Sequence, residues 1–147
     1  IEHEPIPGKE EYLNSEKYEI KTRDWNQDGN IKTYIGHLNW LRQSNTALQQ
    51  TSNLRFVAVD DNDVIGFVKE SPAGDNAVAV AIALNRGGTR QFWFHFGDIE
   101  IGPQHDRRRV RAIENLITGE QHTIEWGGVR LRIEPDQDPA LLFRCLV

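Results

Sequence analysis

Two stretches of sequence decide the fold class: Ala77–Leu84, which reads AVAVAIAL, and Arg90–Phe96, which reads RQFWFHF. The first is almost entirely small and apolar, as in a central strand that is covered on both faces. The second alternates with a period of two, so its three phenylalanines fall on one face and Trp93 and His95 on the other. We therefore expect both to be strands of a β domain with one apolar core.

The rest of the sequence after residue 53 supplies further strands and the turns that join them. Asp60–Asp63 is typical of a hairpin turn, and Gly127–Gly128 is a strong two-residue hairpin signal. About eight short strands within about 95 residues predict an antiparallel β-sandwich. The further strands are expected at Leu54–Val59, Val64–Lys69, Glu120–Trp126, Val129–Glu134 and Ala140–Val147.

A helix is predicted before the sandwich, because apolar residues from Ile31 to Leu48 recur near the i, i+3, i+4, i+7 spacing. Asp28 or Asn30 is placed to cap its first turn, and the pattern fades at Ser44–Thr46. A lone amphipathic helix has little surface to pack against, so we expect it to end a domain that lies upstream. The stripe consists of Ile31, Tyr34, Ile35, Leu38, Leu41 and Leu48.

Residues 1–29 have the composition of a polar loop. The chain opens at Ile1 and contains no Met, and we interpret it as the C-terminal piece of a larger protein. The predicted division places the end of an upstream domain at residues 1–50 and the sandwich at residues 51–147.

Composition argues against several classes of protein. A net charge of -5 and a pI near 5.5 argue against a nucleic-acid partner. No apolar run approaches the ~18 residues that a membrane helix needs. The single cysteine, Cys145, excludes an intramolecular disulfide, favours a reducing compartment such as the cytoplasm, and lies among apolar neighbours as a buried, inert thiol does. No Cys/His cluster has zinc spacing, so no metal or other cofactor is expected.

Three motifs resemble the C-terminal end of the α-amylase superfamily, glycoside hydrolase family 13. Pro7–Trp25, PGKEEYLNSEKYEIKTRDW, looks like the loop after the eighth barrel strand in the maltosyltransferases of bacterial glycogen synthesis. Leu38–Gln49 resembles the eighth barrel helix and its ending, with Thr46 where proline is usual. Glu114–Glu120, ENLITGE, resembles a recurrent turn of the sandwich. The resemblance implies a sandwich of the α-amylase C-terminal type, preceded by the last loop and helix of a truncated (β/α)8 barrel.

In the resembled maltosyltransferases, maltosyl units pass from α-maltose 1-phosphate to the non-reducing end of an α-1,4-glucan, with retention. The resemblance places Lys17 and Tyr18 at the donor maltosyl unit; the alternative is that Lys17 is solvated and Tyr18 packs under the loop. Ser15 and Glu16 are further candidates, and hydrogen bonding within the loop is their alternative role. A lysine offers three donors to sugar hydroxyls, and a tyrosine adds a ring face and a hydroxyl. The resemblance also implies that the parent enzyme is a homodimer and that this chain relies on the missing barrel.

Retaining glycosyl transfer needs two carboxyl groups about 5 Å apart. In the resembled family they come from earlier barrel strands, so we predict no catalytic residue here and an inactive chain. The polar loop nevertheless offers carboxylates from which a pair is conceivable. They are Glu2, Glu4, Glu10, Glu11, Glu16, Glu19 and Asp24.

Two other functions stay open: the C-terminal domain of a hydrolytic amylase, and a non-catalytic sandwich that binds glucan or stabilises its neighbour. Glucan binding would use Trp93 and His95, because exposed aromatic rings on a sheet can stack against sugars. The alternative is that these two residues pack against the missing barrel. Trp25 and Trp40 are better explained by packing between barrel and sandwich. Arg107–Arg109, with Arg111, is expected to form a solvated basic loop, although it could attract phosphate or an acidic partner.

Overall fold

A computed structural model describes residues 4, 6–9, 20 and 22–147. The chain divides into two compact units, residues 1–39 and 40–147, and each is considered by itself. The larger unit is mainly antiparallel β, which confirms the predicted sandwich class. The barrel remnant and the boundary at residue 50 stay predictions.

The predicted helix is present as α1 (Lys32–Ser44). The side-chain Oδ1 of Asn30 accepts a hydrogen bond from the backbone N–H of Lys32 at 3.1 Å, so Asn30 is the cap rather than Asp28. Among the residues of the predicted stripe, Leu41 is buried, whereas Ile31 and Ile35 are 64% and 48% exposed. The predicted stripe is therefore only partly buried.

The end of α1 is fixed by two asparagines. Buried Asn45 donates from Nδ2 to the carbonyl of Leu41 at 2.9 Å, and its Oδ1 accepts from Asn76 Nδ2 at 3.2 Å. The Oδ1 of Asn76 in turn accepts from the backbone N–H of Ala47, in the 3-10 helix η1 (Thr46–Gln49). Because an unpaired buried amide is costly, this chain of bonds specifies where the helix stops.

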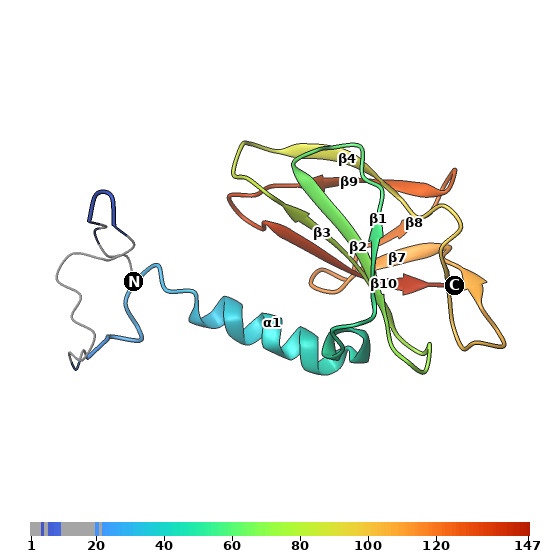
Figure 1. Cartoon of the computed structure of the whole chain (residues 1–147), viewed down its shortest axis with the longest axis horizontal. Helices are drawn as coiled ribbons and strands as arrows, with labels where there is room; N and C mark the ends of the chain where they lie inside the picture. The colour runs from blue at the N-terminus through green and yellow to red at the C-terminus, as the bar shows by residue number, and fades with distance from the viewer. Residues whose placement is uncertain (1–3, 5, 10–19, 21) are drawn as a thin grey trace. The chain divides into compact units, whose positions relative to one another are not determined.

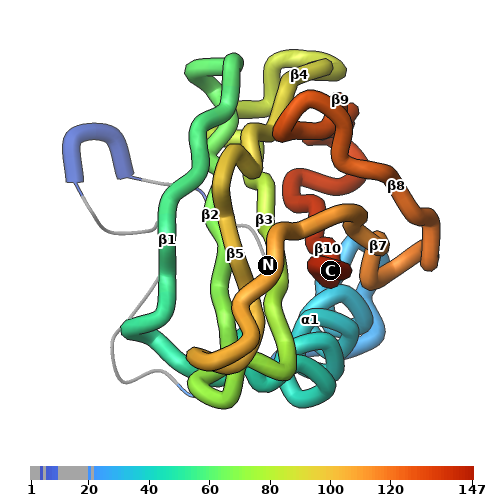
Figure 2. The backbone as a smooth tube through the Cα atoms, turned by 90° about the vertical axis from the view of Figure 1, so that its right-hand side faces the viewer, coloured from blue at the N-terminus to red at the C-terminus, as the bar shows by residue number. Residues whose placement is uncertain are grey.

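The larger layer of the sandwich is a six-stranded sheet in which all neighbours are antiparallel. Figure 2 shows β1, β2 and β3 side by side. The strand β3 lies between β2 and β10, and Val78–Ala81 are buried on both faces, as its sequence predicted. In spatial order the strands are β1 (Leu54–Val57), β2 (Val64–Glu70), β3 (Ala77–Ala83), β10 (Ala140–Leu146), β7 (Ala112–Asn115) and β8 (Gln121–Thr123).

The second layer is a ribbon of two strands, β4 (Arg90–His95) and β9 (Gly128–Ile133), which run together above the large sheet in Figure 1. The phenylalanines of the alternating stretch are at most 2% exposed and face the six-stranded sheet across the core, as predicted. A short ribbon of β5 (Glu100–Ile101) and β6 (Arg108–Arg109) lies in a region that was predicted to be a loop.

The predicted pairing of the strands around Gly127–Gly128 is wrong. Glu125 and Gly128 exchange two backbone hydrogen bonds of 2.9 Å, so a tight turn forms at Trp126–Gly127. Beyond it the strands separate, because β8 pairs with β7 in the large sheet and β9 pairs with β4 in the ribbon. This divergence places the three apolar side chains of β9 (Val129, Leu131 and Ile133) in the core between the layers.

Candidate functional site

Lys17 and Tyr18, the predicted donor-binding residues, lie outside the described residues, as do Ser15 and Glu16. Their role therefore stays a prediction. Of the loop carboxylates, Glu4 and Asp24 are described, and Asp24 closes a turn by accepting a hydrogen bond from the backbone N–H of Asn26 at 2.9 Å. Asp24 thus has a structural role in the turns that lead into α1.

Trp93 and His95 share the outer face of the β4–β9 ribbon, as predicted, and their rings are 6.2 Å apart at an interplanar angle of 62°. The indole of Trp93 rests on the backbone of β9 at Gly128. A Cβ added at Gly128 would lie 2.2 Å from Trp93 Nε1 and 2.7 Å from the backbone carbonyl oxygen of Phe94, so the ring and the backbone of β4 both require glycine at this position. The half-buried indole of Trp93 belongs to neither apolar core cluster.

Trp126, at the turn before Gly128, was not recognised from the sequence as a candidate. Its side chain is 96% exposed and its φ is 52°, the left-handed region that favours glycine. That conformation costs a bulky residue about 1–2 kcal/mol. The following Gly127, with φ of 80°, accepts a backbone hydrogen bond of 2.7 Å from Gly97 and so ties the turn to the end of β4. The sequence signal was a tryptophan inside a turn dipeptide that calls for small residues.

A groove of about 410 Å³ lies where β8 and β9 separate. Its floor includes Leu131 and Phe143, and the ring of His122 meets that of Phe143 edge to face at 5.9 Å. Planar polar side chains surround this floor. They are Gln91, Asn115, Glu120, His122, Arg130 and Arg132.

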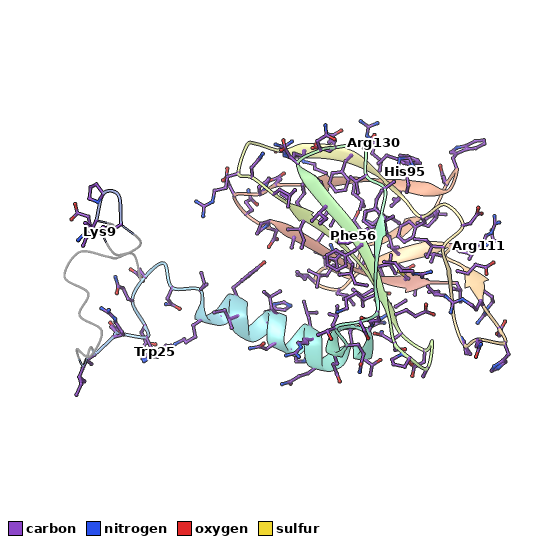
Figure 3. All side chains as sticks on the ribbon, viewed as in Figure 1. Lys9, Trp25, Phe56, His95, Arg111 and Arg130 are labelled. Carbon is purple, nitrogen blue, oxygen red and sulfur yellow. The ribbon has the colours of Figure 1, made fainter. Side chains whose placement is uncertain are left out.

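Arg130 connects this groove to the outer face of the ribbon, because it lines the groove and is the Cα partner of Trp93. Figure 3 shows Arg130 and His95 on the same side of the sandwich. No carboxylate of the described residues is within ion-pairing distance of Arg130, whereas Arg132 pairs with Glu134 at 2.6 Å. Arg130 therefore offers a guanidinium that the described fold does not use.

The arginine run is held more firmly than a solvated loop would be. Arg107 donates to the carboxylate of Glu70 at 2.9 Å and to the carbonyl of Gly102 at 3.1 Å. The backbone N–H of Gly102 donates to the same carboxylate at 2.8 Å, and Arg109 pairs with exposed Asp98 at 2.7 Å. Arg107 thus fastens the β5–β6 segment to β2 and is a structural residue.

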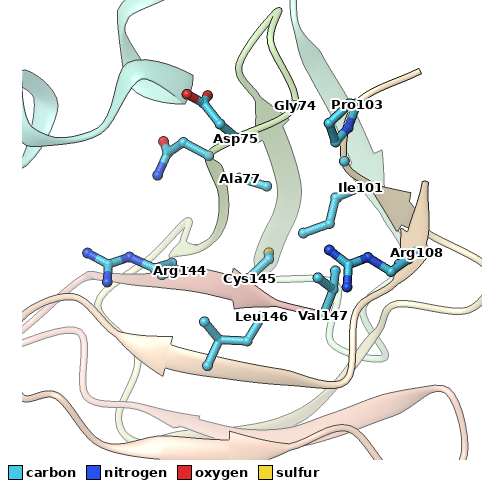
Figure 4. Close-up of a pocket in the computed structure, with 12 residues that line it drawn as sticks. Gly74, Asp75, Ala77, Ile101, Pro103, Arg108, Arg144, Cys145, Leu146 and Val147 are labelled. Atoms are coloured by element: carbon cyan, nitrogen blue, oxygen red, sulfur yellow. The ribbon is translucent and has the colours of Figure 1, made fainter. Parts of the chain in front are cut away.

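A larger cavity of about 640 Å³ lies at the end of β10, with Arg108 and Arg144 on opposite sides (Figure 4). Each arginine has a carboxylate at 3.6–3.7 Å. Cys145 lines this cavity, and burial raises the pKa of its thiol to about 12, so the thiol stays protonated at neutral pH and is no nucleophile. The inert cysteine predicted from the sequence is confirmed.

The described residues contain no group of three or more His, Cys, Asp or Glu side chains placed to hold a metal ion. None of their helices is both long and apolar enough to cross a membrane. Trp25 and Trp40, predicted to pack between barrel and sandwich, are 74% and 59% exposed, and that role stays a prediction.

Comparison with known proteins gives one consistent result. The chain is 40% identical, over 97% of its length, to "Alpha-1,4-glucan:maltose-1-phosphate maltosyltransferase" of Chlorobaculum tepidum. It is 39% identical to the enzyme of that name in Methylacidiphilum infernorum over 94% of its length, and 33% identical to that of Mycobacterium tuberculosis over 92%. The chain spans about a fifth of the length of these curated relatives, from 20% to 22%. No family model matches the chain.

Proposed function

The chain is homologous to the C-terminal part of the α-1,4-glucan:maltose-1-phosphate maltosyltransferases, and we propose that it works as the corresponding part of such an enzyme. The similarity over nearly the whole chain is the observation that carries this proposal. The parent enzyme would transfer maltosyl units from α-maltose 1-phosphate to the non-reducing end of an α-1,4-glucan, with retention and release of phosphate. It would act in the cytoplasm as a homodimer.

In this proposal the chain packs against the barrel of the parent enzyme and stabilises it, and it makes one contact with the substrate. The catalytic carboxylates lie elsewhere in the parent. Exposed apolar surface supports a packing partner beyond the described residues. Phe56 on the edge strand β1, labelled in Figure 3, is 70% exposed. Leu84 is 60% exposed, and Ile31 and Ile35 on the apolar side of α1 are 64% and 48% exposed. Apolar side chains on a helix stripe and at a sheet edge are typical of surfaces that another domain covers.

Lys17 and Tyr18 are proposed to hold the outer glucose of the donor. Lysine donates to sugar hydroxyls and tyrosine packs a ring face on the sugar. Binding energy from this remote unit would position the reacting glucose against the catalytic groups. The chain alone is therefore expected to be inactive.

The test is phosphate release by the full-length parent, given maltose 1-phosphate and a malto-oligosaccharide, with Lys17→Ala measured beside it. We expect phosphate release coupled to chain growth in steps of two glucose units. Removal of one charged hydrogen-bond donor to the sugar should lower kcat/KM about tenfold or more. Glucan cleavage without phosphate release would identify a hydrolase instead. Unchanged kcat/KM in Lys17→Ala would remove the donor-binding role.

A further inference from the structure

We propose that the outer face of the β4–β9 ribbon, continuous with the groove beside β9, is a binding surface for an α-glucan chain. Trp93 and Trp126 would be its ring platforms, and Arg130 would bind hydroxyl groups between them and the groove. This inference rests on the proposed function, because it names a second contact for the glucan that the parent enzyme would extend. It is independent of Lys17 and Tyr18.

The position of Trp93 is the first observation. A large ring on the outside of a two-stranded ribbon contributes nothing to the core, and the indole rests on β9 at Gly128, where the carbonyl oxygen of Phe94 also leaves no room for a side chain. The backbone supports one part of the indole, and the exposed part is available to solvent. An indole held in this way presents a preformed apolar surface, and the C–H face of a pyranose ring packs on such a surface. A preformed platform also binds with little loss of side-chain entropy.

Trp126 is the second observation. It lies two residues before Gly128, so both indoles belong to the same end of the ribbon. Its ring is 96% exposed and its backbone is in a region that glycine would occupy more easily. The tight turn requires positive φ at this position but does not require tryptophan, and a bulky residue that buries nothing there suits ligand contact, since strain of this kind is concentrated at functional sites.

The polar groups beside the two rings suit a polyhydroxylated ligand. Arg130 has no carboxylate partner among the described residues, and the planar side chains around the groove can each bind adjacent hydroxyls. The backbone adds further groups. The backbone N–H and C=O of Gly128 both bond to Glu125 and therefore point away from β4. Backbone groups of every second residue in a strand point the same way, so the N–H and C=O groups of Arg130 and Arg132 also point away from β4, towards the groove.

The length of the surface and the net charge of the whole chain favour a neutral polymer. The chain carries a net charge of -5, which disfavours an anionic polymer such as a nucleic acid. From Gly128 to Arg132 the strand covers about 13 Å, which is longer than one sugar ring. A glucan offers apolar ring faces and hydroxyl rims in succession, and both kinds of contact are present along this surface.

The experiment is calorimetric titration of the 147-residue chain with maltoheptaose, with variants at both indoles. We expect Trp93→Ala to weaken binding about tenfold, from the loss of one aromatic platform. Trp126→Gly should weaken binding about threefold and raise the midpoint of thermal unfolding, because glycine adopts positive φ without strain. Opposite changes in affinity and stability cannot come from misfolding.

Trp25→Ala is the matched control, since Trp25 is an exposed tryptophan of the other unit and should leave the affinity unchanged. No binding at millimolar maltoheptaose, or equal binding by wild type and Trp93→Ala, would overturn the proposed surface. If the full-length parent releases phosphate from maltose 1-phosphate while the chain binds no maltoheptaose, the surface alone is overturned. If the chain binds through Trp93 and the parent releases no phosphate, the maltosyltransferase proposal fails and a glucan-binding sandwich remains.

Discussion

Helix α1 and strand β3 both have an apolar pattern in sequence, but they differ in how far their apolar side chains are buried. Val78–Ala81 of β3 are at most 5% exposed, because β2 and β10 flank the strand and side chains cover both faces. The apolar stripe of α1 stays open at Ile31, Tyr34 and Ile35. An apolar pattern is therefore associated with full burial in β3 and with exposed side chains along α1.

The largest expected effect is at the core of the sandwich. Phe92→Ala removes a ring that is 1% exposed and should lower the free energy of unfolding by about 3–5 kcal/mol, as measured by denaturant titration. Ile35→Ala is the matched change on α1 and should alter it by at most about 0.5 kcal/mol in this chain. A large loss in Ile35→Ala would mean that the helix stripe is already buried in solution, and the contrast would fail.

A smaller effect is expected where the β5–β6 segment is fastened to the large sheet. Glu70 is 13% exposed and accepts hydrogen bonds from Arg107 and Gly102. Glu70→Gln would remove the carboxylate that pairs with Arg107 at 2.9 Å and with Arg55 at 3.7 Å, and it should cost about 1–2 kcal/mol, less than for a fully buried pair because both arginines are partly solvated. Arg109→Gln, which breaks an exposed pair, should change stability by less than about 0.5 kcal/mol in the same titration. An equal loss of stability in the two variants would show that the difference in burial does not make the Glu70 pair stronger than the Arg109 pair.

The smallest effect is a dependence of stability on alkaline pH. Burial raises the pKa of the Cys145 thiol from 9.0 to about 12. As the pH rises, the unfolded chain therefore loses this proton before the folded chain does. The contribution of the thiol to the free energy of unfolding is constant below pH 9.0 and decreases as the pH rises from 9.0 towards 12. Between wild type and Cys145→Ala, the difference in unfolding free energy should shrink by roughly 1 kcal/mol near pH 10. A pH-independent difference would place the thiol in water.

By itself the sequence determined the local structure of this protein. The alternation of Arg90–Phe96 fixed which side chains face the core, because successive residues of a strand point to opposite faces. The small apolar residues of Ala77–Leu84 identified the central strand, and two capping candidates, Asp28 and Asn30, located the start of α1, of which the structure selects Asn30. The resemblance of the chain to maltosyltransferases was also readable from short motifs and is confirmed by the comparisons.

Tertiary structure alone decided the long-range contacts. The turn signal at Gly127–Gly128 predicts that the chain reverses direction. It does not predict that β8 pairs with β7 and β9 with β4, which places the two strands in different layers. The role of Gly128 as the seat of Trp93 depends on a cross-strand contact, and the bond from Arg107 to Glu70 joins residues 37 positions apart. Such contacts depend on how layers meet in space, and local spacing carries no information about that.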